Sequence, residues 1–99
     1  MSTAKKTQLM SRDIMQGGMP LKQFAWKSSQ ATVAEGDDWA TVYLIESTDR
    51  NKGHATELMK ILKFLYETKG KTFGGTIALN PAMKRVYEKS GVYEYEEEI

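Results

Sequence analysis

The sequence predicts a mixed α/β (α+β) domain in which one layer of helices packs on a β-sheet. Three observations support this prediction. Residues 42–45 form a nearly continuous apolar run, residues 54–70 have helical periodicity, and a second helical segment lies between Pro81 and Gly91. A covered central strand followed by an amphipathic helix is typical of such domains. The predicted element order is β, β, α, β, α, β.

The chain of 99 residues has room for one domain. Residues 1–20 are polar and irregular and end in Gly17, Gly18 and Pro20, which is a turn signal. We therefore expect a flexible N-terminal arm over residues 1–20 and a single domain over residues 21–99.

The first two strands are expected over residues 24–33, "FAWKSSQATV", and residues 39–47, "WATVYLIES". The first mixes aromatic and β-branched residues with polar ones, as a half-buried strand does. The second holds the apolar run and is predicted to be central in the sheet. The intervening "AEGDD" predicts a turn, so the two strands should form a hairpin.

The first helix is expected over "HATELMKILKFLYETKG", because apolar residues recur there at steps of three and four. Gly70 stands at the expected C-terminal cap. The segment "KTFGGTIAL" is then expected to be a third strand, which Gly74 and Gly75 weaken or mark with a bulge.

The second helix is expected to begin at Asn80 and to end at Gly91. Asn is a favoured N-cap residue, and Pro81 suits the first helical position because its missing N–H group would be unpaired there. The tail "VYEYEEEI" alternates enough to predict a last strand.

Composition excludes several classes of function. The formal net charge of +1 gives no global field for nucleic acid or an anionic membrane, although Lys5, Lys6 and Arg12 leave a nucleic-acid or host-factor binder as a weak alternative. The chain has no cysteine, so thiolate metal sites and a cysteine nucleophile are excluded, and we expect no metal site. No apolar run approaches the length of a membrane span, so we expect a cytoplasmic protein that does not bind membranes.

The turn at residues 49–56, "DRNKGHAT", joins the central strand to the first helix. The first helical turn has unpaired N–H groups and the positive end of the helix dipole, which together favour phosphate. Gly53 allows close backbone approach, and Arg50 and Lys52 add positive charge. The alternative is a solvated turn without a ligand, since the spacing fits neither a P-loop nor a three-glycine dinucleotide fingerprint.

Two motifs resemble one known family. "RNKGHA" resembles the Arg/Gln-x-x-Gly-x-Gly/Ala motif with which GNAT N-acetyltransferases bind the pyrophosphate of acetyl-coenzyme A. "NPAMKRVYEKSGV" resembles the later motif of that family, in which an Asn starts a helix that carries a Tyr seven residues later. The resemblance covers roughly residues 39–93. It implies a GNAT-like fold with a mainly antiparallel mixed sheet and splayed central strands.

The resemblance also implies that acetyl-CoA is the cosubstrate and an amine the acceptor. The N–H group of one strand residue would meet the thioester carbonyl, the turn would bind the pyrophosphate, and an Asn would contact the pantetheine arm. The cofactor-binding residues implied in this way are Ile45, Arg50, Asn51, Lys52, Gly53, His54, Ala55, Thr56 and Asn80.

Acetyl transfer to an amine needs a neutral amine, donors for the oxyanion and a proton for the leaving thiolate. By resemblance Tyr87 is the general acid, although its helical spacing from Met83 also fits packing on the sheet. Glu46 is the candidate general base, although strand alternation places it on the face opposite Ile45. Other candidates are water and the turn carboxylates of Glu35, Asp37 and Asp38, whereas His54 is expected to point to solvent.

Two expectations about function therefore follow, beside the weak alternative of a nucleic-acid or host-factor binder. The first is an N-acetyltransferase acting on a primary amine of a small molecule, protein or peptide. The second, from a different class, is an acyl-CoA-binding or protein-interaction module without turnover. We also expect that the edge of the last strand leaves room for a homodimer formed by sheet extension.

Overall fold

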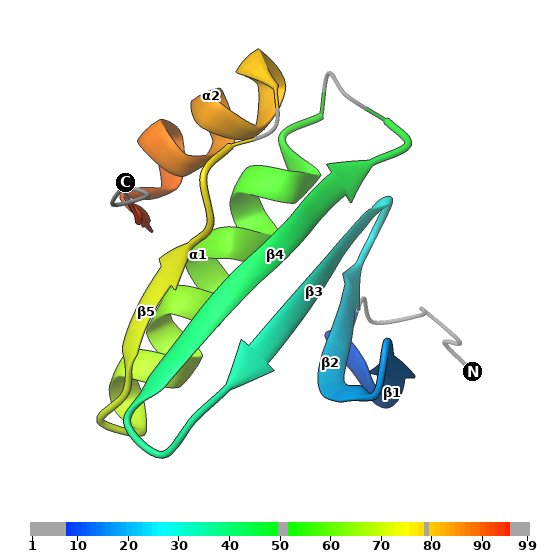
Figure 1. Ribbon diagram of the computed structural model, residues 1–99. Coiled ribbons are helices and arrows are strands. Elements are labelled where there is room, and N and C mark those ends of the chain that lie inside the picture. Colours follow the sequence, from blue (N-terminus) through cyan, green and yellow to red (C-terminus); the bar gives the residue numbers. More distant parts are fainter. Residues whose placement is uncertain (1–7, 50–51, 79, 96–99) are drawn as a thin grey trace, which may run out of the picture.

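The computed structural model describes residues 8–49, 52–78 and 80–95. One six-stranded sheet has the strand order β1-β2-β3-β4-β5-β6 and carries two helices (Figure 1). Neighbours from β1 to β4 pair antiparallel, and β5 pairs parallel with both β4 and β6. The elements in chain order are β1 (Met10–Gln16), β2 (Met19–Trp26), β3 (Ser29–Glu35), β4 (Trp39–Ser47), α1 (His54–Thr68), β5 (Thr72–Gly75), α2 (Pro81–Ser90) and β6 (Tyr93–Glu94).

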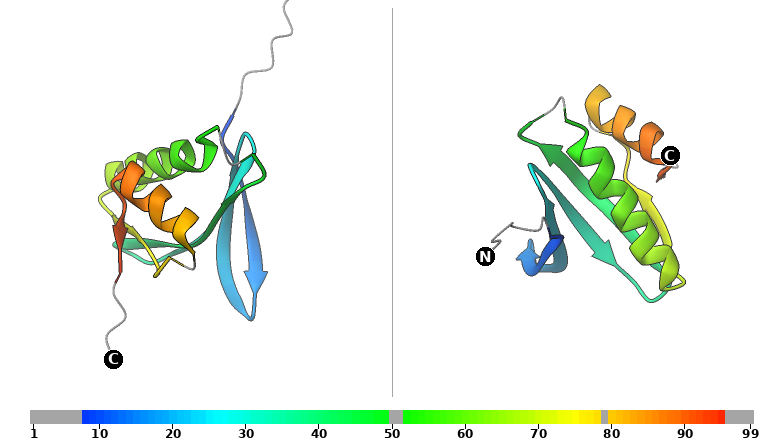
Figure 2. Two further views of the ribbon diagram at one scale, coloured as in Figure 1. Left: turned by 90° about the horizontal axis from the view of Figure 1, so that it is seen from above. Right: turned by 180° about the vertical axis from the view of Figure 1, so that it is seen from behind.

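Both helices lie on the same face of the sheet, as the views from above and from behind show (Figure 2). The helical periodicity of α1 is confirmed, because Leu58, Met59, Leu62 and Tyr66 are fully buried against the sheet. The parallel connections from β4 to β5 and from β5 to β6 run in the same direction across the sheet, and such connections are generally right-handed, which places successive helices on one face. The predicted class, a mixed sheet with one layer of helices, is confirmed.

The expected arm over residues 1–20 is wrong for its second half. Met10–Gln16 forms β1 and pairs with β2, and Gln16 lies opposite Met19. Gly17 and Gly18 have φ angles of 58° and 78°, which suits a two-residue hairpin turn and matches the twist of the flanking strands. The glycines therefore close a hairpin rather than end an arm, while residues 1–7, which include Lys5 and Lys6, lie outside the described residues.

The expected first strand over residues 24–33 is also wrong, because it spans two strands. Trp26 pairs with Ser29, so the chain reverses at Lys27, whose φ of 53° is left-handed. Side-chain composition did not reveal this turn, since it contains neither Gly nor Pro.

The later elements follow the prediction more closely. The α2 helix begins after Asn80, whose Oδ1 accepts a 2.9 Å hydrogen bond from the Met83 N–H, and Gly91 ends it with a φ of 72°. The third strand is shorter than expected and pairs with β4 in continuous register, without a bulge. Of the expected last strand, Tyr93 and Glu94 form β6, and residues 96–99 lie outside the described part.

A β-bulge interrupts the pairing of β3 with β4. Thr32 lies opposite Leu44 and Val33 opposite Val42, so Tyr43 is the extra residue. As a result Tyr43 and Leu44 both face away from the helices, and Ile45 returns to the helix side, where it is 4 % exposed.

The face of the sheet opposite the helices is partly closed by the sheet itself. The β1–β2 hairpin runs across the direction of β4 (Figure 2, left), and strand twist of this kind curls a sheet over its own face. Leu21 and Ala34, which the strand register assigns to this face, are 8 % and 3 % exposed. Trp39, Tyr43 and Leu44 stay exposed at the rim.

Candidate functional site

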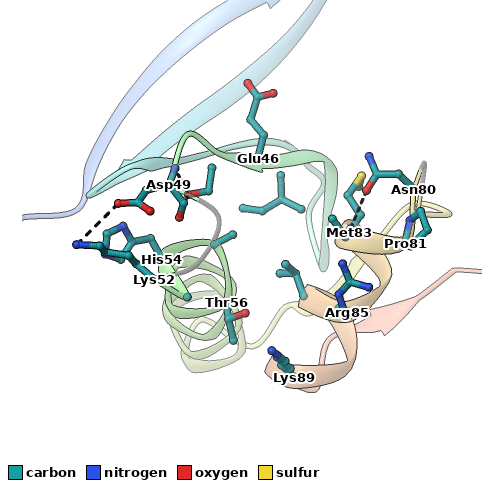
Figure 3. A pocket seen from close by; sticks show the side chains of 16 residues that line it. Glu46, Asp49, Lys52, His54, Thr56, Asn80, Pro81, Met83, Arg85 and Lys89 are labelled. Atoms are coloured by element: carbon teal, nitrogen blue, oxygen red, sulfur yellow. Dashed lines mark hydrogen bonds and ion pairs between the residues drawn. The ribbon is translucent and has the colours of Figure 1, made fainter.

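A cleft of about 1050 Å³ lies where the end of β4, the start of α1 and one side of α2 meet (Figure 3). Its size is at the upper end for small-molecule sites, which leaves room for an extended ligand. Three elements and the turn before α1 contribute its walls. The lining residues are Ile45, Glu46, Ser47, Asp49, Lys52, Gly53, His54, Ala55, Thr56, Asn80, Pro81, Ala82, Met83, Arg85, Val86 and Lys89.

The cleft opens where β4 and β5 separate. Their last paired residues are Val42 and Gly75, and the Thr76 N–H donates to the Val42 carbonyl at 2.9 Å. Residues 43–47 of β4 continue with no β5 partner among the described residues. The paired part of β4 and β5 therefore ends before the last five residues of β4.

Within this gap the N–H group of Ile45 points away from β3. The Thr48 N–H donates to the Ser28 carbonyl at 3.0 Å, and N–H groups alternate in direction along a strand. Three residues earlier, the Ile45 N–H therefore faces the open side, and Ile45 lines the cleft.

No described side chain caps the start of α1. Gly53 is its N-cap residue, with a φ of 70° and no capping hydrogen bond. The Glu57 N–H donates to the Gly53 carbonyl, so the N–H groups of His54, Ala55 and Thr56 precede the first intrahelical bond. All these residues but Glu57 line the cleft, which gives it a wall of backbone donors at the positive end of the helix dipole.

Lys52 brings positive charge to this wall. It forms a long, exposed ion pair with Asp49, with an N–O distance of 3.9 Å. An exposed pair of this kind contributes little free energy, so Lys52 can bind another anion instead. Arg50 and Asn51, which were also expected to flank the pyrophosphate, lie outside the described residues.

The expectation that His54 points to solvent is wrong. Its Nδ1 lies 2.7 Å from Ser28 Oγ and 3.4 Å from the Ser28 backbone nitrogen, and these hydrogen bonds join the β2–β3 turn to the start of α1. Because the Ser28 N–H group can only donate, Nδ1 is the acceptor in that bond. Ser47 Oγ continues the chain at 2.8 Å from Ser28 Oγ, which ties the end of β4 to the start of α1.

Asn80 and Glu46 occupy opposite parts of the cleft rim. Asn80 lines the cleft while its Oδ1 caps α2, as expected. Glu46 also contributes to the lining, but its carboxylate is exposed and points away from both helices (Figure 3). This agrees with the predicted strand alternation. Among the described residues, the Glu46 carboxylate has no hydrogen-bond or ion-pair partner that would support a role as general base.

Tyr87 lies behind the cleft wall and is not one of its lining residues. It is 2 % exposed, and its hydroxyl has no hydrogen-bond partner in the described part of the chain. Burial raises the pKa of Tyr87, and the negative charge of Glu94 raises it further. The Thr76 side chain lowers this pKa, although it makes no hydrogen bond of normal geometry with the hydroxyl. The phenol is therefore protonated at neutral pH, and its position beside Gly75 puts it at the closed end of the strand gap.

Gly75 makes the close approach of Tyr87 to the sheet possible. A Cβ atom at Gly75 would lie 2.5 Å from both Cζ and the hydroxyl oxygen of Tyr87. Gly75→Ala is expected to displace the ring and to lower the free energy of unfolding by about 1–3 kcal/mol, measured by urea denaturation. Gly74→Ala is the comparison at the neighbouring position, because its Cβ would approach the Tyr95 ring and the Tyr93 carbonyl less closely, at 2.9–3.0 Å, and it should cost less stability. An equal loss in both variants would contradict a specific contact between Gly75 and Tyr87.

Sequence reasoning missed Arg85 and Lys89, which line the cleft from α2. Their spacing of one helical turn was the available signal, because residues at i and i+4 share a helix face. Charged residues on a helix usually face solvent, so the spacing alone did not mark them. It also missed Ser28, which reaches His54 only through the tertiary fold.

Searches against protein-family models, curated proteins and solved structures found no significant match to the chain. Within residues 8–49, 52–78 and 80–95, no helix is long and apolar enough to span a bilayer. The same residues contain no cluster of three or more His, Asp or Glu side chains that could hold a metal ion.

Proposed function

We propose that the protein is a GNAT-like N-acetyltransferase that transfers the acetyl group of acetyl-CoA to a primary amine. One observation carries the proposal: a single cleft joins the uncapped start of α1 to the opened end of β4. The first feature suits a pyrophosphate and the second suits an extended arm with a carbonyl at its end. Described residues of both sequence motifs line this cleft, residues 52–55 of the first and residues 80–83, 85, 86 and 89 of the second.

In this proposal the pyrophosphate accepts hydrogen bonds from the N–H groups of His54, Ala55 and Thr56, with Lys52 beside it. The pantetheine arm runs along the gap between β4 and β5. The thioester carbonyl accepts a hydrogen bond from the Ile45 N–H, which stabilises the developing oxyanion. Asn80 contacts the arm from the start of α2.

The reaction needs no side-chain nucleophile, because binding both substrates in a fixed pose supplies much of the rate. The neutral amine attacks the thioester carbon, the C–S bond breaks, and the thiolate takes a proton from Tyr87. The amine loses its proton to water or to Glu46, which stands on the other side of β4. The acceptor, an amine of a small molecule, protein or peptide, then approaches from the face of the sheet opposite the helices.

The first test is calorimetric titration with acetyl-CoA, desulfo-CoA and ADP. Acetyl-CoA is expected to bind with a Kd of about 1–100 μM, typical for substrates of enzymes. Desulfo-CoA should bind similarly, and ADP should bind more weakly but measurably through its pyrophosphate. Release of free thiol on addition of amines then measures turnover. Absence of binding by acetyl-CoA would refute the proposal.

A second candidate function is an acyl-CoA-binding or protein-interaction module without turnover. Two observations favour it: Tyr87 does not line the cleft, and the Glu46 carboxylate points away from it. Binding of acetyl-CoA without thiol release, over a panel of small amines and lysine peptides, would favour this function over the enzyme.

A further inference from the structure

Arg85 and Lys89 form a pair of unneutralised cations on the cleft side of α2. They lie one helical turn apart, both are exposed, and neither has an ion pair or side-chain hydrogen bond to the described residues. Lys84, on the same helix, contrasts with them. It pairs with Glu94 at 3.4 Å and does not line the cleft.

The pair stands on a different wall from the start of α1. In Figure 3 Arg85 projects from α2 toward the space below Glu46, across the cleft from Thr56, and Lys89 lies one turn further along α2. The two carboxylates in the lining do not neutralise it: Asp49 pairs with Lys52, and Glu46 points away from α2. The cleft therefore has two separate positive poles, one made by backbone N–H groups and one by side-chain cations.

We propose that Arg85 and Lys89 bind a second phosphate of the ligand, a phosphomonoester separate from the pyrophosphate at α1. This inference rests on the proposed function, in which the ligand is acetyl-CoA, and it assigns the pair to the 3′-phosphate on the ribose. A guanidinium donates two parallel hydrogen bonds to a phosphate, and an ammonium adds a point charge. The pair would thus make the protein select CoA thioesters over their 3′-dephospho forms.

The test is a double comparison of ligand and variant at one fixed salt concentration. Acetyl-CoA and acetyl-3′-dephospho-CoA are titrated into the wild type and into Arg85→Gln, Lys89→Gln and the double variant. The wild type is expected to bind acetyl-CoA about ten-fold or more tightly than the dephospho form, as for hydrogen bonds to charged groups. In the double variant this preference should disappear, while affinity for the dephospho form stays within about two-fold of wild type.

Lys84→Gln is the matched control, because it removes one positive charge from the same helix outside the cleft. It should keep the wild-type preference, and circular dichroism should show that all variants keep their helices. Equal binding of the two ligands by the wild type would overturn the inference and leave the proposed function standing. A preference that survives in the double variant, or that Lys84→Gln reduces equally, would also overturn it. If the wild type binds neither ligand, the proposed function fails, and the inference fails with it.

Discussion

Replacing Tyr87 by Phe is expected to lower the turnover number for acetyl transfer by about 100-fold or more, the usual contribution of a general acid. The Kd for acetyl-CoA should stay unchanged, because a general acid interacts with the thiolate as it departs rather than with the bound thioester. The phenol is a suitable donor at neutral pH, since burial raises its pKa above the ordinary value. Ionisation of Tyr87 therefore should not reduce turnover until the pH rises beyond about 10.

The same substitution is expected to leave the free energy of unfolding unchanged or to raise it by about 1 kcal/mol. The Tyr87 hydroxyl is buried and has no partner among the described residues, and removing an unpaired buried polar group is neutral or stabilising. A structural role for the hydroxyl would instead give a less stable variant.

Steady-state thiol release, calorimetry and urea denaturation together measure the three quantities. Unchanged turnover in a protein that acetylates amines would show that Tyr87 is not the general acid. A clear loss of stability would show that the hydroxyl has a hydrogen-bond partner in the folded protein.

Gly53→Glu is expected to weaken binding of acetyl-CoA by more than about 100-fold, because it places a carboxylate where the pyrophosphate would bind and like charges in contact cost several kcal/mol. A side chain at position 53 could also weaken binding by straining the backbone. Gly53 has a φ of 70°, so any side chain costs about 1–3 kcal/mol in stability, although its Cβ would meet no atom within 4 Å.

Two controls separate charge from backbone strain. Gly53→Gln has nearly the same shape and strain without the charge, and it should keep affinity within about ten-fold of wild type. Gly70→Glu carries the same charge at a φ of 81° near the far end of α1, and it should leave binding unchanged. Equal losses in Gly53→Glu and Gly53→Gln would mean that the turn conformation, rather than an anion site, explains the effect.

The elements that could be predicted from the sequence are those whose signals are local. The α1 helix has an apolar face at steps of three and four, and α2 has a capping Asn, a Pro and a terminal Gly, so both were predicted. The β1–β2 hairpin was missed because β1, "MSRDIMQ", is mostly exposed and has no apolar alternation. Its two glycines were assigned to the end of an arm, and only pairing with β2 shows that they form a turn.

The residues of the candidate site also fall into those that local sequence signals predict and those that only the tertiary fold brings together. The turn before α1 and the cap at Asn80 are contiguous motifs, so their residues were named from the sequence. The hydrogen bond from Ser28 to His54 joins residues 26 positions apart, and no periodicity predicts it. The Arg85–Lys89 pair was visible as a spacing, but only the packing of α2 beside α1 makes it part of the cleft.

The bulge at Tyr43 affects both the opening of the cleft and the stability of the sheet. It stands directly after Val42, the last residue of β4 that pairs with β5, and a bulge bends its strand and increases the local twist. Without the extra residue Ile45 would still face α1, because Val42 and Ile45 would be two steps apart in a regular strand. Such a strand could continue its pairing with the segment after β5 and gain stability as the cleft closed. Deletion of Tyr43 is therefore expected to straighten β4, to let its pairing extend toward the segment after β5, and to raise the free energy of unfolding while it narrows the cleft and weakens ligand binding.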